Sequence, residues 1–303
     1  MKPFSMEIPN RMQGILWMIA SCFFSALMMA MVRYLCASFH PFQVVFFRNF
    51  FSLILFIPWL YKNGAGAIKT TKLPQYSVRA ISGVTAMFMW FFALSRVPLS
   101  QATALSFSAP LFTTLAAVIF LKEKTTIHRI AALAAGFFGT FIILRPGFAG
   151  FDYISLFVLF AAVFWSTSSL LIKSLTKTEG PTVIVFYMTA MMTPLSFLPA
   201  LLHWKTPQMA DLPPLLLLGV ISTFFQLALS RAFAKADLTA ILPFDFLRLI
   251  FTAIIAYVAF AEIIDGWTVL GGVIILGSTI YVAYKEAGFK RRPKTAPAMA
   301  GVE

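Results

Sequence analysis

Three ionisable residues fall deep inside apolar stretches of the chain, where a charge is costly and is therefore a candidate functional group. Arg48 lies in the stretch 41–60, and Asp245 and Arg248 lie in the stretch 238–261. An arginine in such a place can hold a solute carboxylate through two parallel hydrogen bonds. Asp245 is the only deep carboxylate in the sequence, which makes it the candidate for binding and releasing a proton within such a stretch.

Each of these residues also has a structural interpretation. Asp245 and Arg248 are three residues apart, so they share a helical face and can simply neutralise each other. Arg48 would then be the uncompensated cation, unless it extends to the membrane surface or bonds to backbone carbonyls. Trp90 and the phenylalanines around Arg48 can stack against a flat substrate ring or contact a cation, although most phenylalanines must pack against lipid or other helices.

Two prolines and two glutamates mark the stretches 99–121 and 238–261. Pro110 interrupts the first and Pro243 lies near the start of the second; each removes a backbone hydrogen bond, which is tolerated where a cavity or a neighbouring group satisfies the freed carbonyl. We therefore expect both helices to line a central path, with Ser106 facing that path or a neighbouring helix. Glu123 and Glu262 end the two stretches, either as gate residues or as ordinary helix-end charges.

Ten apolar stretches must position these residues. Each holds about 17–24 residues, enough to cross a hydrocarbon core of about 30 Å. Hydrophobic residues make up 60% of the chain, against about 45–50% in soluble domains. We therefore predict an all-α polytopic membrane protein with ten transmembrane helices. The stretches are 14–35, 41–60, 76–95, 99–121, 128–144, 153–175, 181–202, 213–233, 238–261 and 267–284.

The sequence is internally repeated at a separation near 140. Because each copy holds five stretches, the second copy starts on the opposite side of the membrane, and two inverted five-helix repeats of this kind are typical of secondary transporters. The predicted divisions are residues 1–147 and 148–287, followed by a basic tail over 288–303. The matched landmarks are Arg33 with Lys173, Ala93–Arg96 with Ala228–Arg231, and Glu123 with Glu262.

The net charge of +13 is explained by topology rather than by nucleic acid, for which we expect no affinity. Of the 24 Lys and Arg residues, 18 fall on one side of the predicted membrane, Arg79 counted among them, and four on the other. Cytoplasmic loops carry the excess of Lys and Arg, so both termini are predicted to be cytoplasmic. The basic tail is a topology anchor, with contact to lipid headgroups as a lesser interpretation.

An enzyme is disfavoured because the spans lack the groups that membrane hydrolases need. His40, His128 and His203 fall in connectors or at span edges, and no Walker sequence is present. We expect no catalytic residue, metal or cofactor. Small residues such as Gly139 and Gly271 recur in the fifth and tenth stretches, where they indicate close internal packing or, as a second interpretation, a homodimer interface.

Three segments resemble the drug/metabolite transporters with paired EamA domains. They are 39–52, 104–112 with 121–123, and 243–249 with Glu262, which are similar to that family's second, fourth and ninth helices. The resemblance covers essentially the whole chain and implies a ten-helix carrier of the bacterial inner membrane, with a central site that opens alternately to each side. Within the family, the chain is similar to S-adenosylmethionine uptake carriers around Arg48 and the fourth helix.

The expected function is secondary transport of a small metabolite, an amino-acid-like or S-adenosylmethionine-like solute. Alternatives are an exporter of amino acids or drugs, a riboflavin uptake carrier and, from another class, a channel or a structural membrane protein. The expected partners are the solute and the lipid bilayer. The candidate substrate-binding residues are Arg48, Trp90, Ser106, Pro110, Asp245 and Arg248, and the candidate gate residues are Glu123 and Glu262.

Overall fold

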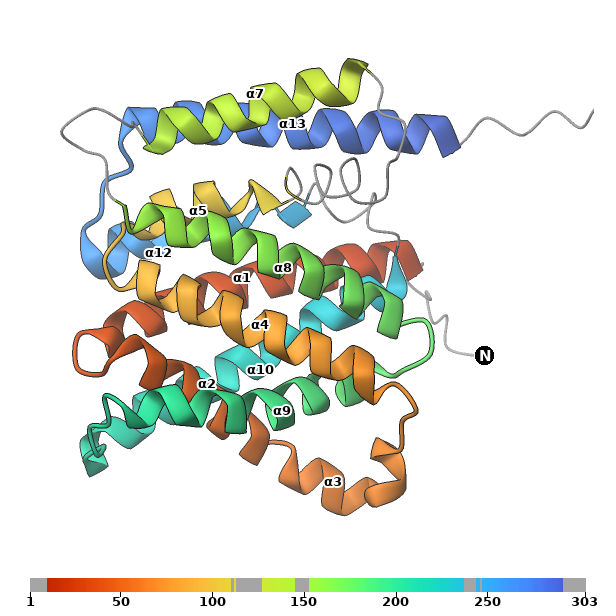
Figure 1. The fold of residues 1–303 in the computed structure, drawn as a ribbon, viewed down its shortest axis with the longest axis vertical. Coiled ribbons are helices and arrows are strands. Elements are labelled where there is room, and N and C mark those ends of the chain that lie inside the picture. The colour runs from red at the N-terminus through yellow and green to blue at the C-terminus, as the bar shows by residue number, and fades with distance from the viewer. Residues whose placement is uncertain are drawn as a thin grey trace, which may run out of the picture.

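The computed structural model describes residues 10–109, 112, 127–144, 153–236, 244–245 and 247–290, and their regular structure is helical throughout (Figure 1). This confirms the all-α prediction for the described part of the chain. The elements are α1 (Asn10–Cys36), α2 (Pro41–Ile54), α3 (Ile57–Asn63), the 3-10 turn η1 (Ala65–Ile68), α4 (Leu73–Leu94), α5 (Leu99–Ser106), α7 (Ile127–Leu144), α8 (Ser155–Leu175), α9 (Pro181–Leu201), η2 (Met209–Asp211), α10 (Leu212–Lys235), α12 (Leu247–Phe260) and α13 (Gly266–Lys290).

In the part of the chain that the structure describes, six helical segments are long and apolar enough to cross a membrane. They are Met12–Cys36, Pro41–Asn63, Leu73–Leu94, Ser155–Leu175, Pro181–Leu201 and Met209–Lys235. Ala134–Leu144, Leu247–Phe260 and Gly266–Ser278 form shorter apolar helices. The chain is therefore a multi-pass membrane protein. Much of the predicted span 99–121 and the start of the span 238–261 lie outside the described residues, so the count of ten helices stays a prediction.

The predicted span 41–60 is divided into α2 and α3. His40 caps α2, because its Nδ1 accepts a hydrogen bond from the Phe42 amide, and Pro41 provides a preorganised first turn. The ring of Pro58 would clash with the carbonyl four residues earlier, that of Ile54, where α2 ends. The break leaves Arg48 in the middle of a short helix.

The helices of the two halves contact one another in matched pairs. The first helix of each half packs against the third spanning helix of the other, α1 against α10 and α8 against α4, while α2 packs against α9 and α7 against α13. Exchanging the halves leaves this set of contacts unchanged, as an internal repeat requires. In Figure 1 the start of α1 and the end of α13 lie on the same side of the bundle.

Gly139 and Gly271 lie in close contact between α7 and α13, which lie side by side at one edge of the bundle (Figure 1). A Cβ at Gly271 would lie 2.5 Å from the carbonyl oxygen of Gly139, and a Cβ at Gly139 would lie 2.8 Å from that of Gly271. The small-residue pattern thus serves internal packing at these two positions. The homodimer stays a prediction.

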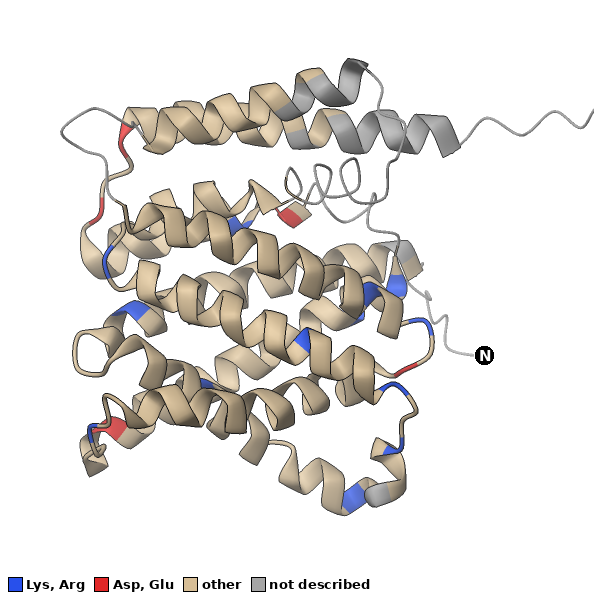
Figure 2. Cartoon of the chain, in the orientation of Figure 1, with Lys and Arg blue, Asp and Glu red and all other residues tan. Residues whose placement is uncertain are grey.

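Charged residues gather at the ends of the helices and in the connectors, with few along the helices (Figure 2). One of those few was wrongly assigned from the sequence. Arg79 was placed among the cytoplasmic charges, but α4 begins at Leu73, so Arg79 lies nearly two turns inside the helix, and its side chain is 1% exposed. The bundle interior therefore holds one more cation than the sequence indicated.

Candidate functional site

Arg48 lies in the interior of the bundle, on α2. The residue is 1% exposed, and its Nη1 donates to Asn49 Oδ1 at 2.8 Å and lies 3.5 Å from the sulfur of Met87 on α4. Its Nε has no hydrogen-bond partner among the described residues. Arg48 therefore neither extends to the membrane surface nor, within the described structure, bonds to a backbone carbonyl, which were its structural interpretations.

Arg79 is the second interior cation, and sequence reasoning missed it. Its Nη2 lies 3.3 Å from the sulfur of Met188 on α9, and its Nε and Nη1 have no described partner. Met188 is the residue that the 140-residue repeat aligns with Arg48, so the repeat carries a cation in one half and a thioether in the other. The sequence did offer a signal for its burial, because Arg79 lies inside the predicted apolar stretch 76–95.

Arg48 and Arg79 form what we call the guanidinium pair: both are buried, Arg48 contacts Met87 on the same face of α4 as Arg79, and no carboxylate side chain that the structure describes lies against either cation. Each carboxylate whose side chain the structure describes is engaged elsewhere. The contacts are those of Glu179 with Thr70, Asp211 with the Gln208 amide, Asp245 with Arg248, Glu262 with Arg33 and Asp265 with Thr268. Burying a charge without a partner costs several kcal/mol by order of magnitude, so two such charges call for an explanation.

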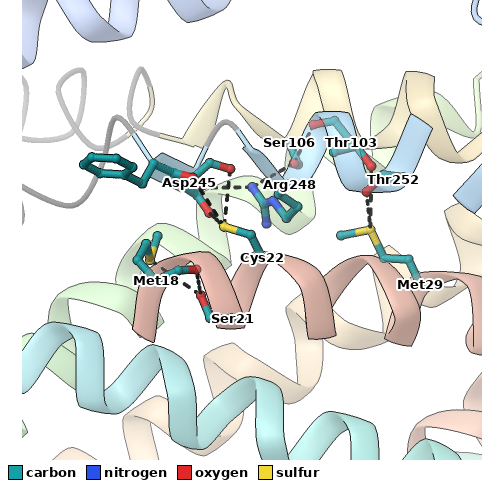
Figure 3. Close-up of polar contacts among 10 residues, drawn as sticks. Met18, Ser21, Cys22, Met29, Thr103, Ser106, Asp245, Arg248 and Thr252 are labelled. Atoms are coloured by element: carbon teal, nitrogen blue, oxygen red, sulfur yellow. Dashed lines mark hydrogen bonds and ion pairs between the residues drawn. The ribbon is translucent and has the colours of Figure 1, made fainter. Parts of the chain in front are cut away.

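The Asp245–Arg248 cluster is a separate polar centre, where α1, α5 and the start of α12 meet (Figure 3). Arg248 Nη2 lies 3.3 Å from Asp245 Oδ2 and 3.4 Å from Ser106 Oγ, and its guanidinium lies over the ring of Phe107. The Cys22 thiol donates to Asp245 Oδ1 at 3.7 Å. The two charges thus neutralise each other, as one interpretation of the sequence held, while Ser106 joins them.

The predicted site residues do not all come together. Trp90 is half-buried on α4 and packs against the apolar core, with no described contact to Arg48 or to the Asp245–Arg248 cluster. Pro110 and Glu123 lie outside the described residues. Among the rest, the structure joins Ser106, Asp245 and Arg248 and shows no contact between them and Arg48.

Glu262 forms what we call the Arg33–Glu262 latch. Its Oε1 lies 2.6 Å from Arg33 Nη1, which also donates to the Val97 carbonyl at 2.9 Å, and its Oε2 accepts the Leu99 amide at 2.9 Å. Ala261 ends α12 in the left-handed conformation, with φ of 53°, and the Glu262 amide returns to the Ala256 carbonyl. The latch therefore ties the end of α1, the start of α5 and the end of α12.

Lys173 occupies the corresponding position in the second half. Its Nζ donates to the carbonyls of Phe233 at 2.7 Å and Ala236 at 3.0 Å. The repeat aligns Lys173 with Arg33, whose Nη1 donates to the Val97 carbonyl just after α4, and Ala236 likewise lies just after α10. Thus one contact of the latch recurs in the other half, with lysine in place of arginine.

Comparison with known proteins identifies the family of this bundle. The model of the EamA-like transporter family matches the chain twice, over residues 12–145 and 153–284. The chain belongs to the EamA-like transporter family. The first match covers one helix of every matched pair and the second match covers its partner helix. Both halves of this EamA protein therefore match the family model.

Several relatives of this EamA protein are named for transport. The S-adenosylmethionine uptake transporter of Rickettsia prowazekii is 33% identical over 91% of this chain and 94% of its own length. The riboflavin transporter of Rhizobium johnstonii is 30% identical, with 95% and 97% covered. The pseudopaline exporter CntI of Pseudomonas aeruginosa is 26% identical, with 91% and 97% covered.

The fold is also found in a solved crystal structure. It superposes with a TM-score of 0.64 at 18% identity and covers 91% of this chain and 98% of the other. The family and the named relatives together make the protein a membrane transporter of the EamA family, and they point away from an enzyme.

Proposed function

We propose that this EamA transporter carries a small metabolite with a carboxylate group, amino-acid-like or S-adenosylmethionine-like, across the bacterial inner membrane by alternating access. The observation that supports this most is Arg48, a cation that is 1% exposed in a membrane helix and has no carboxylate partner in the described structure. An anionic group of a solute would supply the missing charge and accept two hydrogen bonds from the guanidinium.

The relatives do not choose between substrates or directions. One is named for S-adenosylmethionine uptake, one for riboflavin and one for export of pseudopaline. Riboflavin has no carboxylate to pair with Arg48, so it is the weaker candidate on charge. Export of amino acids or drugs remains the second proposal, because the charge of a site does not fix the direction of net flux.

The gating proposal uses the contacts of Arg33 and Lys173. The Arg33–Glu262 latch closes one end of the bundle, and Lys173 donates to two carbonyls at the end of α10 at the other. Opening the latch would let the halves, proposed as residues 1–147 and 148–287, move against each other. The repeat assigns Glu123 the role opposite Glu262, so Glu123 is the proposed second gate.

Asp245 is the proposed site of proton coupling, if the transporter uses a proton gradient. Protonation would release Arg248 from its ion pair at 3.3 Å and would change the contacts of α12 with Cys22 and Ser106. The Asp245–Arg248 cluster would then respond to a proton at a place separate from the guanidinium pair, since no described contact joins the two.

The test is solute counterflow in proteoliposomes with labelled amino acids, S-adenosylmethionine and riboflavin. Saturable counterflow of a carboxylate-bearing solute supports the carrier, and linear, non-saturating flux would instead indicate a channel. Arg48→Met should abolish counterflow, because it removes the charge and keeps an unbranched apolar side chain. The matched control is Arg96→Met, which removes an exposed cation and should leave counterflow unchanged.

A further inference from the structure

We propose that the guanidinium pair, Arg48 with Arg79, selects a solute with two acidic groups, a small dicarboxylate, over solutes with one carboxylate. The inference rests on the proposed function, because it assigns the chemistry of the same interior site. It narrows the amino-acid-like class to acidic members and disfavours S-adenosylmethionine.

The first argument is charge. The pair contributes two positive charges, and the five carboxylates whose side chains the structure describes all have partners elsewhere. One solute carboxylate would leave one of the two cations uncompensated. Two carboxylates neutralise both, and neutral sites are those that a low-dielectric interior tolerates.

The second argument is unused hydrogen-bonding capacity. A guanidinium has five N–H donors. Arg48 Nε, Arg79 Nε and Arg79 Nη1 are buried without a described partner, and the two closest sulfurs, of Met87 and Met188, are weak acceptors. Each guanidinium therefore keeps buried donor capacity for a carboxylate, one nitrogen in Arg48 and two in Arg79, and a guanidinium can bind both oxygens of a carboxylate.

The third argument is the packing around the pair. Arg79, Gly83 and Met87 follow one face of α4 at intervals of four residues. A Cβ at Gly83 would overlap the methyl group of Met192, so Met192 occupies the space that the glycine leaves. Methionine is flexible and adapts to irregular gaps. Met87, Met188 and Met192 thus fill the surroundings of the pair and can turn aside for a solute.

S-adenosylmethionine fits this charge distribution poorly. It carries a sulfonium, an ammonium and one carboxylate, for a net charge of +1, and it would enter an interior that already holds two unpaired cations. The Asp245–Arg248 cluster supplies no free anion for the sulfonium, because Asp245 pairs with Arg248. Glutarate has a net charge of −2 and glutamate, with its ammonium, of −1, so both have the opposite sign from the pair and are attracted to it.

The experiment compares glutamate with glutamine, which have nearly the same shape and differ in the second acidic group. Two quantities are measured for the wild type, Arg79→Met, Arg79→Lys and the control Arg96→Met. The first is inhibition of the counterflow of the labelled solute by glutamate or by glutamine. The second is thermal stabilisation of the detergent-purified protein by glutamate, glutamine or glutarate. In the wild type, glutamate should act at a concentration at least about tenfold lower than glutamine. Arg79→Met should bring the ratio close to one, Arg79→Lys should restore part of it, and Arg96→Met should leave it unchanged.

The outcomes separate the inference from the proposed function. Counterflow of glutamine or S-adenosylmethionine with no preference for glutamate would overturn the inference and keep the carrier. A preference for glutamate that survives Arg79→Met would overturn the role of Arg79. Stabilisation by phosphate, and by no dicarboxylate, would overturn the substrate class. Stabilisation by glutarate that Arg79→Met removes, without any counterflow, would support the inference while contradicting the carrier.

Discussion

Arg33 on α1 and Glu262 after α12 form an ion pair of 2.6 Å although 228 residues separate them in the sequence. Glu262 also accepts the amide of Leu99 at 2.9 Å, so one carboxylate joins three elements. The ion pair is partly exposed, with side-chain exposures of 25% for Arg33 and 13% for Glu262. Partial access to water makes such a contact reversible, as a gate requires.

Glu262→Gln should loosen the start of α5. The amide cannot form the ion pair, and a hydrogen bond to a charged group contributes about 1.5–3 kcal/mol, so we expect hydrogen exchange at the Leu99 amide to accelerate roughly tenfold or more. Hydrogen–deuterium exchange of the peptide that contains Leu99 measures this. The control is Asp265→Asn, which removes a carboxylate close in sequence that contacts Thr268 and not Arg33. Unchanged exchange in Glu262→Gln would rule out the latch.

Arg48→Met and Arg79→Met should each raise the thermal stability of the purified protein while impairing transport. Replacing a buried charged group that lacks a compensating partner by an apolar one often stabilises, by about 1–4 kcal/mol. Thermal unfolding in detergent, without added solute, measures the change. A fall in stability in both variants would indicate that the guanidinium pair is structural, held by partners outside the described residues.

Gly271→Ala should destabilise the contact between α7 and α13. The added Cβ would lie 2.5 Å from the Gly139 carbonyl, and overpacking of this kind costs about 1–3 kcal/mol. The matched control is Gly277→Ala on the same helix, where an added Cβ meets nothing within 4 Å. A lower unfolding temperature for Gly271→Ala alone confirms internal packing, and equal temperatures for the two variants would contradict it.

Asp245→Asn should remove proton dependence from transport, if Asp245 is the coupling group. The variant keeps a side chain of the same shape and cannot bind or release a proton. The measurement is the pH profile of counterflow from about pH 5.5 to about pH 8, in steps of about one pH unit or less. Asp211→Asn is the control, because Asp211 caps a loop turn through the Gln208 amide. A pH profile that Asp245→Asn leaves unaltered would exclude Asp245 from coupling.

His40 should make the protein less stable under mildly acidic conditions. Partial burial, then the nearby His203 and Arg96, lower the pKa of His40 below its ordinary value of 6.5, and its Nδ1 must stay unprotonated to accept the Phe42 amide. The unfolded chain therefore binds a proton at a higher pH than the folded protein does. Stability should be complete above pH 6.5 and should fall as the pH drops below it.

Thermal unfolding at a series of pH values measures this loss. His40→Asn keeps a side-chain acceptor at the start of α2 and cannot become charged, so its unfolding temperature should depend less on pH. The same slope in His40→Asn and in the wild type would show that other groups set the dependence.

The sequence could predict those features that follow from local chemistry. Long apolar stretches predict membrane helices because backbone groups in lipid must bond within their own segment. Recurrence at a separation near 140 predicts two equivalent halves, and Asp245 with Arg248 predicts an ion pair because residues three apart share a helical face. The place of Pro58 also predicts a break four residues earlier, a consequence that emerged only with the structure.

Only the tertiary structure decided which charges meet and which stay alone. Arg79 looked like a charge at a span edge, and its burial against α9 depends on where α4 begins and on a helix more than a hundred residues away. Glu262 was named from the sequence, but its partner Arg33 could not be, because an ion pair between helix ends is set by packing. Charges in the interior interact through space rather than along the chain, so the sequence determined the helices and their repeat, and the packing decided that Arg48 and Arg79 form a pair.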